Sequence, residues 1–113
     1  MSIGQSSADV SASTLLDSLA AAGLSCANVS SRKGATNVAD EARCSIGDDD
    51  VIVRTFATME DRDRFFEAAG EMVGQLSLDV DAIPRVVGPT WIVTTDSRET
   101  AEKIRQVLGG ELR

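Results

Sequence analysis

Two cysteines, Cys26 and Cys44, are the residues whose type and spacing indicate the most definite chemistry in this chain. Each has apolar neighbours at strand spacing, and adjacent strands bring such positions within bridging distance. A disulfide here would close a loop of about 18 residues, contribute about 3 kcal/mol and indicate an oxidising compartment. Two buried free thiols that pack as small hydrophobic side chains are the alternative. Redox or metal chemistry is disfavoured, because the spacing is not CxxC and the chain has no His.

Arg32 and Lys33 are candidate contact residues. They precede a glycine in a polar loop predicted from Ser30 to Asp40. Loops of this length are frequent places for binding, and two cations beside a glycine suit an anion or an acidic partner. Ordinary solvated loop charges are the alternative interpretation.

Asp79 and Asp81 are the second pair of candidate contact residues. They alternate with apolar residues, which is typical of a strand, so both carboxylates point to one face. A pair of carboxylates performs acid–base chemistry only where a pocket shifts one pKa, and no nearby residue suggests such a pocket. A solvated face is therefore favoured, and the segment Gly74–Pro89 is kept as a second predicted contact region.

The acidic run Asp48–Asp50 follows Gly47 and has the oxygen ligands that a hard cation prefers. It lacks the alternating acids and the distal glutamate of an EF-hand loop. Solvated residues of a hairpin turn explain it better, and no metal site is predicted.

Composition excludes several classes of function. The chain has 113 residues, 18 acids, 11 bases and no His, with a formal charge of -7. This charge disfavours nucleic acid and anionic membranes as partners, and no stretch is long and apolar enough for a membrane span. The chain has no nucleophile elbow, phosphate loop or dinucleotide motif. We therefore predict a protein that is not an enzyme and has no cofactor.

Apolar spacing and capping residues predict three helices. The first begins at Ser13 or Thr14 and ends before Gly23. The second follows Thr58, a suitable N-cap with acids behind it. The third follows the capping box Asp96–Glu99 and is closed by two glycines.

Strands are predicted between the helices, at residues 24–30, 42–46, 51–57 and 90–95, with an additional edge strand or a loop over 76–82. The order helix, strand, strand, strand, helix, (strand), strand, helix indicates an α+β fold. An antiparallel sheet of about four to five strands would carry three helices on one face. Residues 1–12 are predicted to be a flexible leader, and 13–113 a single domain. Trp91 and Phe65 fit the core, whereas Phe66 is expected to be partly exposed.

The pattern of short motifs resembles a group of small actinobacterial secreted or lipoprotein-type domains. The resemblance covers about residues 14–110 and rests on Gly23-Leu24-x-Cys26, Cys44, Phe66 and Ala69, Gly88–Val93, and Ala101, Ile104 and Leu108-Gly109-Gly110. It implies an exported domain with Cys26 and Cys44 bridged. These domains have no settled activity, so no functional residue is carried over. Residues 75–85 depart from the pattern, and a phage- or prophage-encoded relative is also compatible.

The functional hypothesis is an interaction module with a protein partner, exported or associated with the cell envelope. Residues 1–12 lack the basic start and apolar stretch of a signal peptide, so this hypothesis expects that an export signal was removed. The alternative is a cytoplasmic acidic inhibitor, encoded by a phage, that occupies a basic surface of a host protein. The oligomeric state is left open, because an exposed edge strand permits dimerisation.

Overall fold

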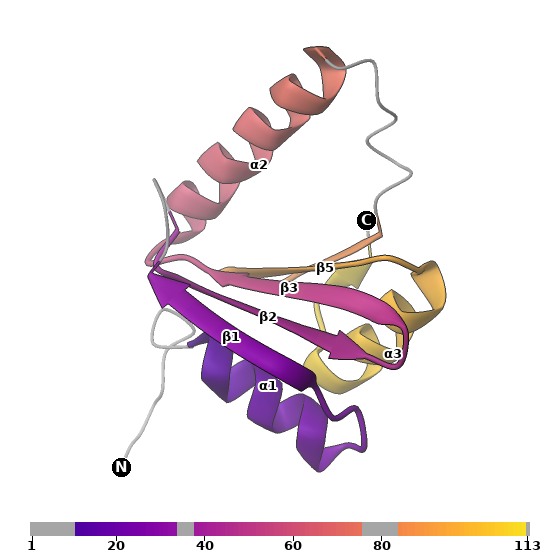
Figure 1. The fold of residues 1–113 in the computed structure, drawn as a ribbon. Coiled ribbons are helices and arrows are strands. Elements are labelled where there is room, and N and C mark those ends of the chain that lie inside the picture. Colours follow the sequence, from indigo (N-terminus) through magenta and orange to yellow (C-terminus); the bar gives the residue numbers. More distant parts are fainter. Residues whose placement is uncertain (1–10, 34–37, 76–83, 113) are drawn as a thin grey trace.

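A computed structural model describes residues 11–33, 38–75 and 84–112 (Figure 1). In this part of the chain six strands form one antiparallel sheet, in the spatial order β1-β2-β3-β5-β4-β6. The strands are β1 (Ala27–Lys33), β2 (Asp40–Ile46), β3 (Asp49–Thr55), β4 (Arg85–Val87), β5 (Trp91–Thr95) and β6 (Glu111–Leu112), and the helices are α1 (Ala12–Ala21), α2 (Met59–Gln75) and α3 (Arg98–Leu108). The predicted α+β class is confirmed, with one or two more short strands than expected.

Capping residues explain where the first and third helices begin. The Ser11 hydroxyl accepts a hydrogen bond from the Thr14 N–H at 3.2 Å, and Ser97 does the same for Thr100 at 3.2 Å. The Asp40 carboxylate also accepts the Ala12 N–H, at 3.2 Å and 3.3 Å. Helix α1 therefore begins at Ala12, slightly earlier than predicted.

A two-residue turn sets the register of the β2–β3 hairpin. Gly47 has a φ of 63°, the positive value that the first position of such a turn requires. Ile46 of β2 consequently lies opposite Asp49 of β3. The pairing continues without a shift, one residue of each strand at a time, to Asp40 opposite Thr55. The alternation along both strands then assigns each side chain to one face of the sheet.

One face of the sheet is covered by α1 and α3, and we call it the helix-covered face. It forms the larger core, which contains Leu15, Leu16 and Leu19 of α1, Ala42 and Cys44 of β2, Val51 and Val53 of β3, Val86, Trp91 and Val93 of β4 and β5, and Ala101 and Ile104 of α3. Trp91 is 5% exposed, as its predicted place in the core requires. A Cβ on Gly88 would lie 2.0 Å from Trp91 Cε2, so the turn before β5 needs glycine there.

Helix α2 lies on the opposite side of the sheet from α1 and α3 (Figure 1). Its Phe65 and Phe66 pack against a second core that contains Val87 and Ile92. The expectation that all helices share one face is therefore wrong for α2. The physical reason is the run of consecutive apolar residues in β4 and β5, which places apolar side chains on both faces, so both need a cover.

Strand β1 lies three residues further along the chain than the predicted strand 24–30, and the predicted loop Ser30–Asp40 is correspondingly shorter. Arg32 and Lys33 belong to β1, opposite Glu41 and Asp40 of β2. The displacement has a simple cause. Residues 31–33 of β1 are polar and lack the apolar alternation that predicts a strand, so the predicted strand ended at Ser30.

Candidate functional site

Four charged residues of three neighbouring strands meet on the sheet face opposite α1 and α3. In the described part of the chain no helix covers this face over β1, β2 and β3, and we call that area the open face. Glu41 lies at its centre. It accepts the Nε–H of Arg43 at 3.0 Å and that of Arg54 at 3.1 Å, while Arg32 Nε lies 3.8 Å from a Glu41 oxygen. These four residues form the arginine cluster.

The register of the sheet explains why these four side chains meet. Arg32 of β1 pairs with Glu41 of β2, which pairs with Arg54 of β3, so the three form one row across the sheet. Arg43 stands two positions further along β2, on the same face as Glu41, in the row of Ser30 and Ile52. Cross-strand and diagonal neighbours at these positions are close enough for long side chains to touch.

The cluster carries an excess of positive charge that is held in place. Burial raises the pKa of the Glu41 carboxyl. The hydrogen bond from Arg43, with the charge and hydrogen bond of Arg54, outweighs burial and holds that pKa below its ordinary value of 4.5. Glu41 is thus an ionised and largely buried carboxylate, with a side chain 10% exposed, shared by three guanidinium groups.

The guanidinium groups approach Glu41 through Nε, which leaves their outer nitrogens available. Within the described residues, the terminal NH2 groups of Arg32, Arg43 and Arg54 donate no hydrogen bond. The side chains of Arg32 and Arg43 are 68% and 49% exposed, whereas that of Arg54 is 19% exposed. Arg32 and Arg43 are therefore the two members that an incoming anion can reach directly.

Two aromatic side chains of α2 mark the limit of the open face. The Arg54 guanidinium carbon lies 5.0 Å from the centroid of Phe65, and that of Arg85 lies 4.8 Å from the centroid of Phe66. Contacts of this kind are attractive, because the ring face is electron-rich. Phe65 and Phe66 are both partly buried and pack against the second core, so the expected partial exposure holds for Phe66, whereas Phe65 is less buried than its predicted place in the core requires.

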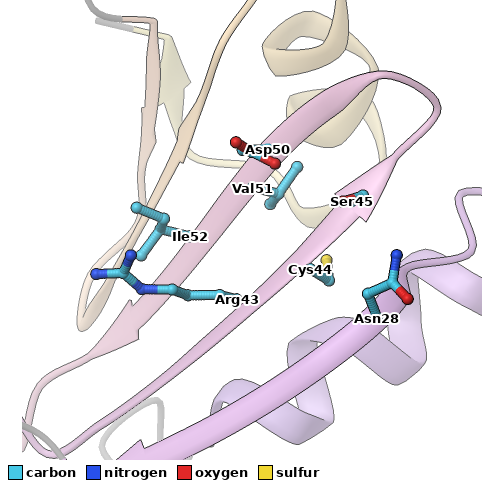
Figure 2. A pocket seen from close by; sticks show the side chains of 7 residues that line it. All are labelled: Asn28, Arg43, Cys44, Ser45, Asp50, Val51 and Ile52. Carbon is cyan, nitrogen blue, oxygen red and sulfur yellow. The ribbon is translucent and has the colours of Figure 1, made fainter.

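A pocket of about 260 Å³ adjoins the arginine cluster. Figure 2 shows that its lining comes from three neighbouring strands; the residues are Asn28, Arg43, Cys44, Ser45, Asp50, Val51 and Ile52. Asn28 has a φ of 56° and lies where the β1–β2 register shifts between Ala27 and Ser30. An amide, a hydroxyl, a guanidinium and a carboxylate therefore line one depression, and such groups hold polar chain atoms by hydrogen bonds.

Cys26 and Cys44 lie together at the edge of the helix-covered face. Their sulfurs are 2.16 Å apart and their Cα atoms 5.3 Å apart, which is bonding distance for a disulfide. The prediction that the fold brings the two residues together is confirmed, although Cys26 immediately precedes β1 instead of lying on it. The pair fastens the start of the edge strand β1 to β2.

The predicted contact residues have different outcomes. Arg32 belongs to the arginine cluster, and Lys33 is the last residue of β1, beside it in sequence. Asp79 and Asp81 lie outside the described residues, as does the additional strand or loop predicted over 76–82.

The acidic run after Gly47 has a structural role at two of its three positions. The Asp49 carboxylate accepts the hydroxyls of Ser97 and Thr100, each at 2.5 Å, and these hydrogen bonds lower its pKa from the ordinary value of 3.8. The Asp50 N–H donates to Asp96 at 2.8 Å. These bonds connect the β2–β3 turn to the start of α3. In the described ranges, no three His, Cys, Asp or Glu residues lie close enough together to hold a metal ion.

Sequence reasoning missed Glu41, Arg43, Arg54 and Arg85. Ile52 and Arg54 are two residues apart on a predicted strand and therefore share a face, whereas Glu41 lies one residue before the predicted strand 42–46 that contains Arg43. The observed two-residue turn at Gly47-Asp48 places Glu41 opposite Arg54 by counting back along both strands, whereas the predicted turn was longer and gave another register. The length of this turn was the signal that could have found the pair, whereas Arg32 lies in the part of β1 that extends beyond the predicted strand 24–30.

Comparison with known proteins does not place the chain in a family: no family model matches it, and no curated protein or solved structure matches it significantly. Among the described residues, none of the helices has the length and apolar character needed to cross a membrane.

Proposed function

We propose that the protein is a non-enzymatic binding module whose contact surface is the open face, and that its partner is a protein with an acidic contact segment. The observation that carries this proposal is the arginine cluster. Three guanidinium groups share one carboxylate on an exposed sheet face of a chain whose overall charge is -7.

Folding alone gives little reason for the third arginine. Arg43 and Arg54 already satisfy the Glu41 carboxylate by hydrogen bonds, whereas the exposed pair with Arg32 contributes only about 0 to 1 kcal/mol to stability and adds a third like charge. For binding the same geometry is useful, because Glu41 holds the arginine side chains in place and a partner carboxylate meets guanidinium groups that have already lost part of their freedom. The excess positive charge also selects against basic partners.

The cysteine pair supports a place outside the cytoplasm. A disulfide persists in an oxidising compartment, and a domain of this size gains from one because its core is small. We propose an exported or envelope-associated module on this ground, in agreement with the resemblance to small secreted actinobacterial domains. Intact mass after alkylation, on protein from the native host, tests it. Detection of two alkylated thiols would show that the cysteines are not bridged and would favour a cytoplasmic protein instead.

Capture of partners by matched variants tests the contact surface. The immobilised protein is incubated with envelope and cytosolic fractions of its host, beside the double variant Arg32→Glu with Arg43→Glu. The control is Arg98→Glu with Lys103→Glu, which changes the charge equally at two exposed positions of α3. Circular dichroism verifies folding, and Arg43→Gln serves as a second variant if the reversal unfolds the domain.

We expect the open-face variant to lose its captured partner and the α3 control to keep it. Capture should also weaken as salt rises from about 0.05 to 0.5 M, since screening reduces exposed charge contacts. Equal capture by both double variants would overturn the proposal. Partners recovered only from the cytosol, and held equally by both variants, would favour the acidic inhibitor instead.

A further inference from the structure

The outer edge of β1 is exposed beside the arginine cluster. β1 is the first strand of the sheet, and in the described part of the chain it pairs with β2 alone. Its residues Ala27 to Arg32 are all exposed, and Val29, at 52%, is one of two large hydrophobic side chains exposed to this extent among the residues that the structure describes. An edge strand of this kind presents backbone N–H and C=O groups to which another strand can bind.

The stretch from Ser30 to Lys33 is the regular part of this edge, because the register shift precedes it. A strand added there would continue the rows of the sheet, so one of its residues would stand beside Arg32, in the row of Glu41. The next residue on the same face would stand beside Ser30, in the row of Arg43. Ser30 is short, so no bulky side chain of β1 stands between that second position and Arg43, whose terminal nitrogens stay available while its Nε is bonded to Glu41.

This placement specifies the charge of the added strand. Of two acidic side chains two residues apart, the first would form a cross-strand charge pair with Arg32, and the second would face the Arg43 guanidinium across Ser30. A second copy of β1 offers no such pair, because Ala27–Lys33 contains Arg32 and Lys33 but no acid. A basic strand would be repelled for the same reason. Charge complementarity therefore points to an acidic strand from a different protein.

We infer that β1 binds an extended segment of the partner as an added strand, and that this segment carries two acidic residues at positions i and i+2. The inference rests on the proposed function and gives its partner a definite chemical form. Backbone hydrogen bonds to the edge supply part of the affinity, and Arg32 and Arg43 supply the selectivity for carboxylates.

Three synthetic peptides test the inference on the full chain. The first is acetyl-Thr-Val-Glu-Val-Glu-Val-Thr-amide, and the second has glutamine in place of both glutamates. The third keeps the glutamates but has N-methyl groups on alternate backbone nitrogens, which removes the hydrogen bonds that a strand needs. Binding is followed by NMR titration of the ¹⁵N-labelled protein, with hydrogen exchange of the β1 amides as the second measurement.

We expect the glutamate peptide to bind at least tenfold more tightly than the glutamine peptide, and the N-methylated peptide to lose binding. Hydrogen exchange in Ser30–Lys33 should slow when the first peptide is present. Arg32→Gln should weaken binding of the glutamate peptide several-fold, whereas Lys103→Gln on α3 should leave it unchanged. Both substitutions are at exposed positions, so neither disturbs the core.

Failure of this inference can be distinguished from failure of the proposed function. Equal binding of the N-methylated peptide would overturn strand addition and leave an acidic contact on the open face. Equal binding of the glutamate and glutamine peptides, or no binding of any peptide, would overturn the inferred segment. If the double variant Arg32→Glu with Arg43→Glu also captures the partner as well as the wild type does, the proposed contact surface itself is wrong.

Discussion

The two faces of this sheet are built from the same strands but are held together by different forces. On the helix-covered face, side chains such as Val51, Val53 and Ile104 are fully buried, and water is excluded by α1 and α3. On the open face, Glu41 and its three arginines are held by charge-assisted hydrogen bonds at the edge of solvent. Apolar burial is non-directional and tolerates exchange of similar side chains, whereas hydrogen-bonded charges need a particular geometry.

The comparison shows which face carries information about function. The helix-covered face has the composition that any small sheet needs in order to fold. On the open face, Glu41 and Arg54 are largely buried and stabilise each other, whereas Arg32 and Arg43 are exposed and their outer nitrogens donate to no partner in the described residues. Exposed charged groups that are held near a fixed carboxylate are the better candidates for contact with another molecule.

The largest expected difference between the faces comes from one substitution made on each. Ile104→Ala on the helix-covered face should lower the free energy of unfolding by about 2 to 5 kcal/mol, because it leaves a cavity at a side chain with 0% exposure. Ile52→Ala on the open face removes the same atoms from a partly exposed position and should cost less than half as much. Urea denaturation measures both. Equal decreases in the free energy of unfolding for the two variants would show that Ile52 is as well buried as Ile104, and that the open face is also covered.

The next effect concerns the cysteine pair that fastens β1. Reduction of a disulfide across this separation of 18 residues should lower the free energy of unfolding by about 3 kcal/mol, because the unfolded chain regains its loop entropy. Denaturation with and without a reducing phosphine measures the change. The double variant Cys26→Ala with Cys44→Ala is the control and should not respond to the reductant. A wild type that is equally unresponsive would contradict the bridge.

An intermediate effect is expected at the centre of the arginine cluster. Glu41→Gln should destabilise the protein by about 1 to 3 kcal/mol at pH 7, because two guanidinium hydrogen bonds lose a charged acceptor and the arginines repel one another. Denaturation at pH 7 measures this. Glu102→Gln is the matched control, since its pair with Arg105 is about 40% exposed and contributes little.

Acid should reduce the effect of the Glu41 substitution. The folded protein lowers the pKa of Glu41, so its contribution to stability is complete above the ordinary value of 4.5 and is lost as the pH falls through the lower folded pKa. The difference between wild type and Glu41→Gln should therefore shrink from about pH 5 to about pH 3. A difference that stays constant over this range would show that Glu41 acts by packing and not by its charge.

The smallest expected effect is at the most exposed arginine. Arg32→Ala should change the free energy of unfolding by less than about 0.5 kcal/mol, because Arg32 is 68% exposed and its Nε lies 3.8 Å from Glu41. Arg54→Ala, at 19% exposure and with contacts to both Glu41 and Phe65, should cost clearly more. Denaturation curves at two salt concentrations measure both. A large decrease in the free energy of unfolding for Arg32→Ala would show that the arginine cluster stabilises the fold and would argue against a role in binding a partner.

The two faces also differ in how far the sequence predicts them. Apolar spacing, capping residues and glycines indicated the three helices, apolar alternation indicated β2, and β-branched or apolar composition indicated β3 and β5, because these signals are local. The helix-covered core follows directly from them. The proximity of Cys26 and Cys44 was also accessible, since both have apolar neighbours at strand spacing.

The open face was harder to predict, because it depends on register between strands and not on the character of one strand. Arg32 was selected as a loop residue, and only its pairing with Glu41 shows that it belongs to a row of charges. The second half of β1 is polar and β6 has only two residues, so neither gives a pattern. The place of α2 required knowing that β4 and β5 have apolar side chains on both faces.

Trp91 is the single tryptophan of a chain without tyrosine, and it lies 5% exposed in the helix-covered core. Its emission should be blue-shifted in the folded protein and should move to longer wavelength on denaturation, which gives an intrinsic optical probe of unfolding. The same placement makes it insensitive to a ligand on the other side of the sheet. A fluorescence titration without a spectral change would therefore be no argument against binding, and a label on the ligand is the appropriate reporter.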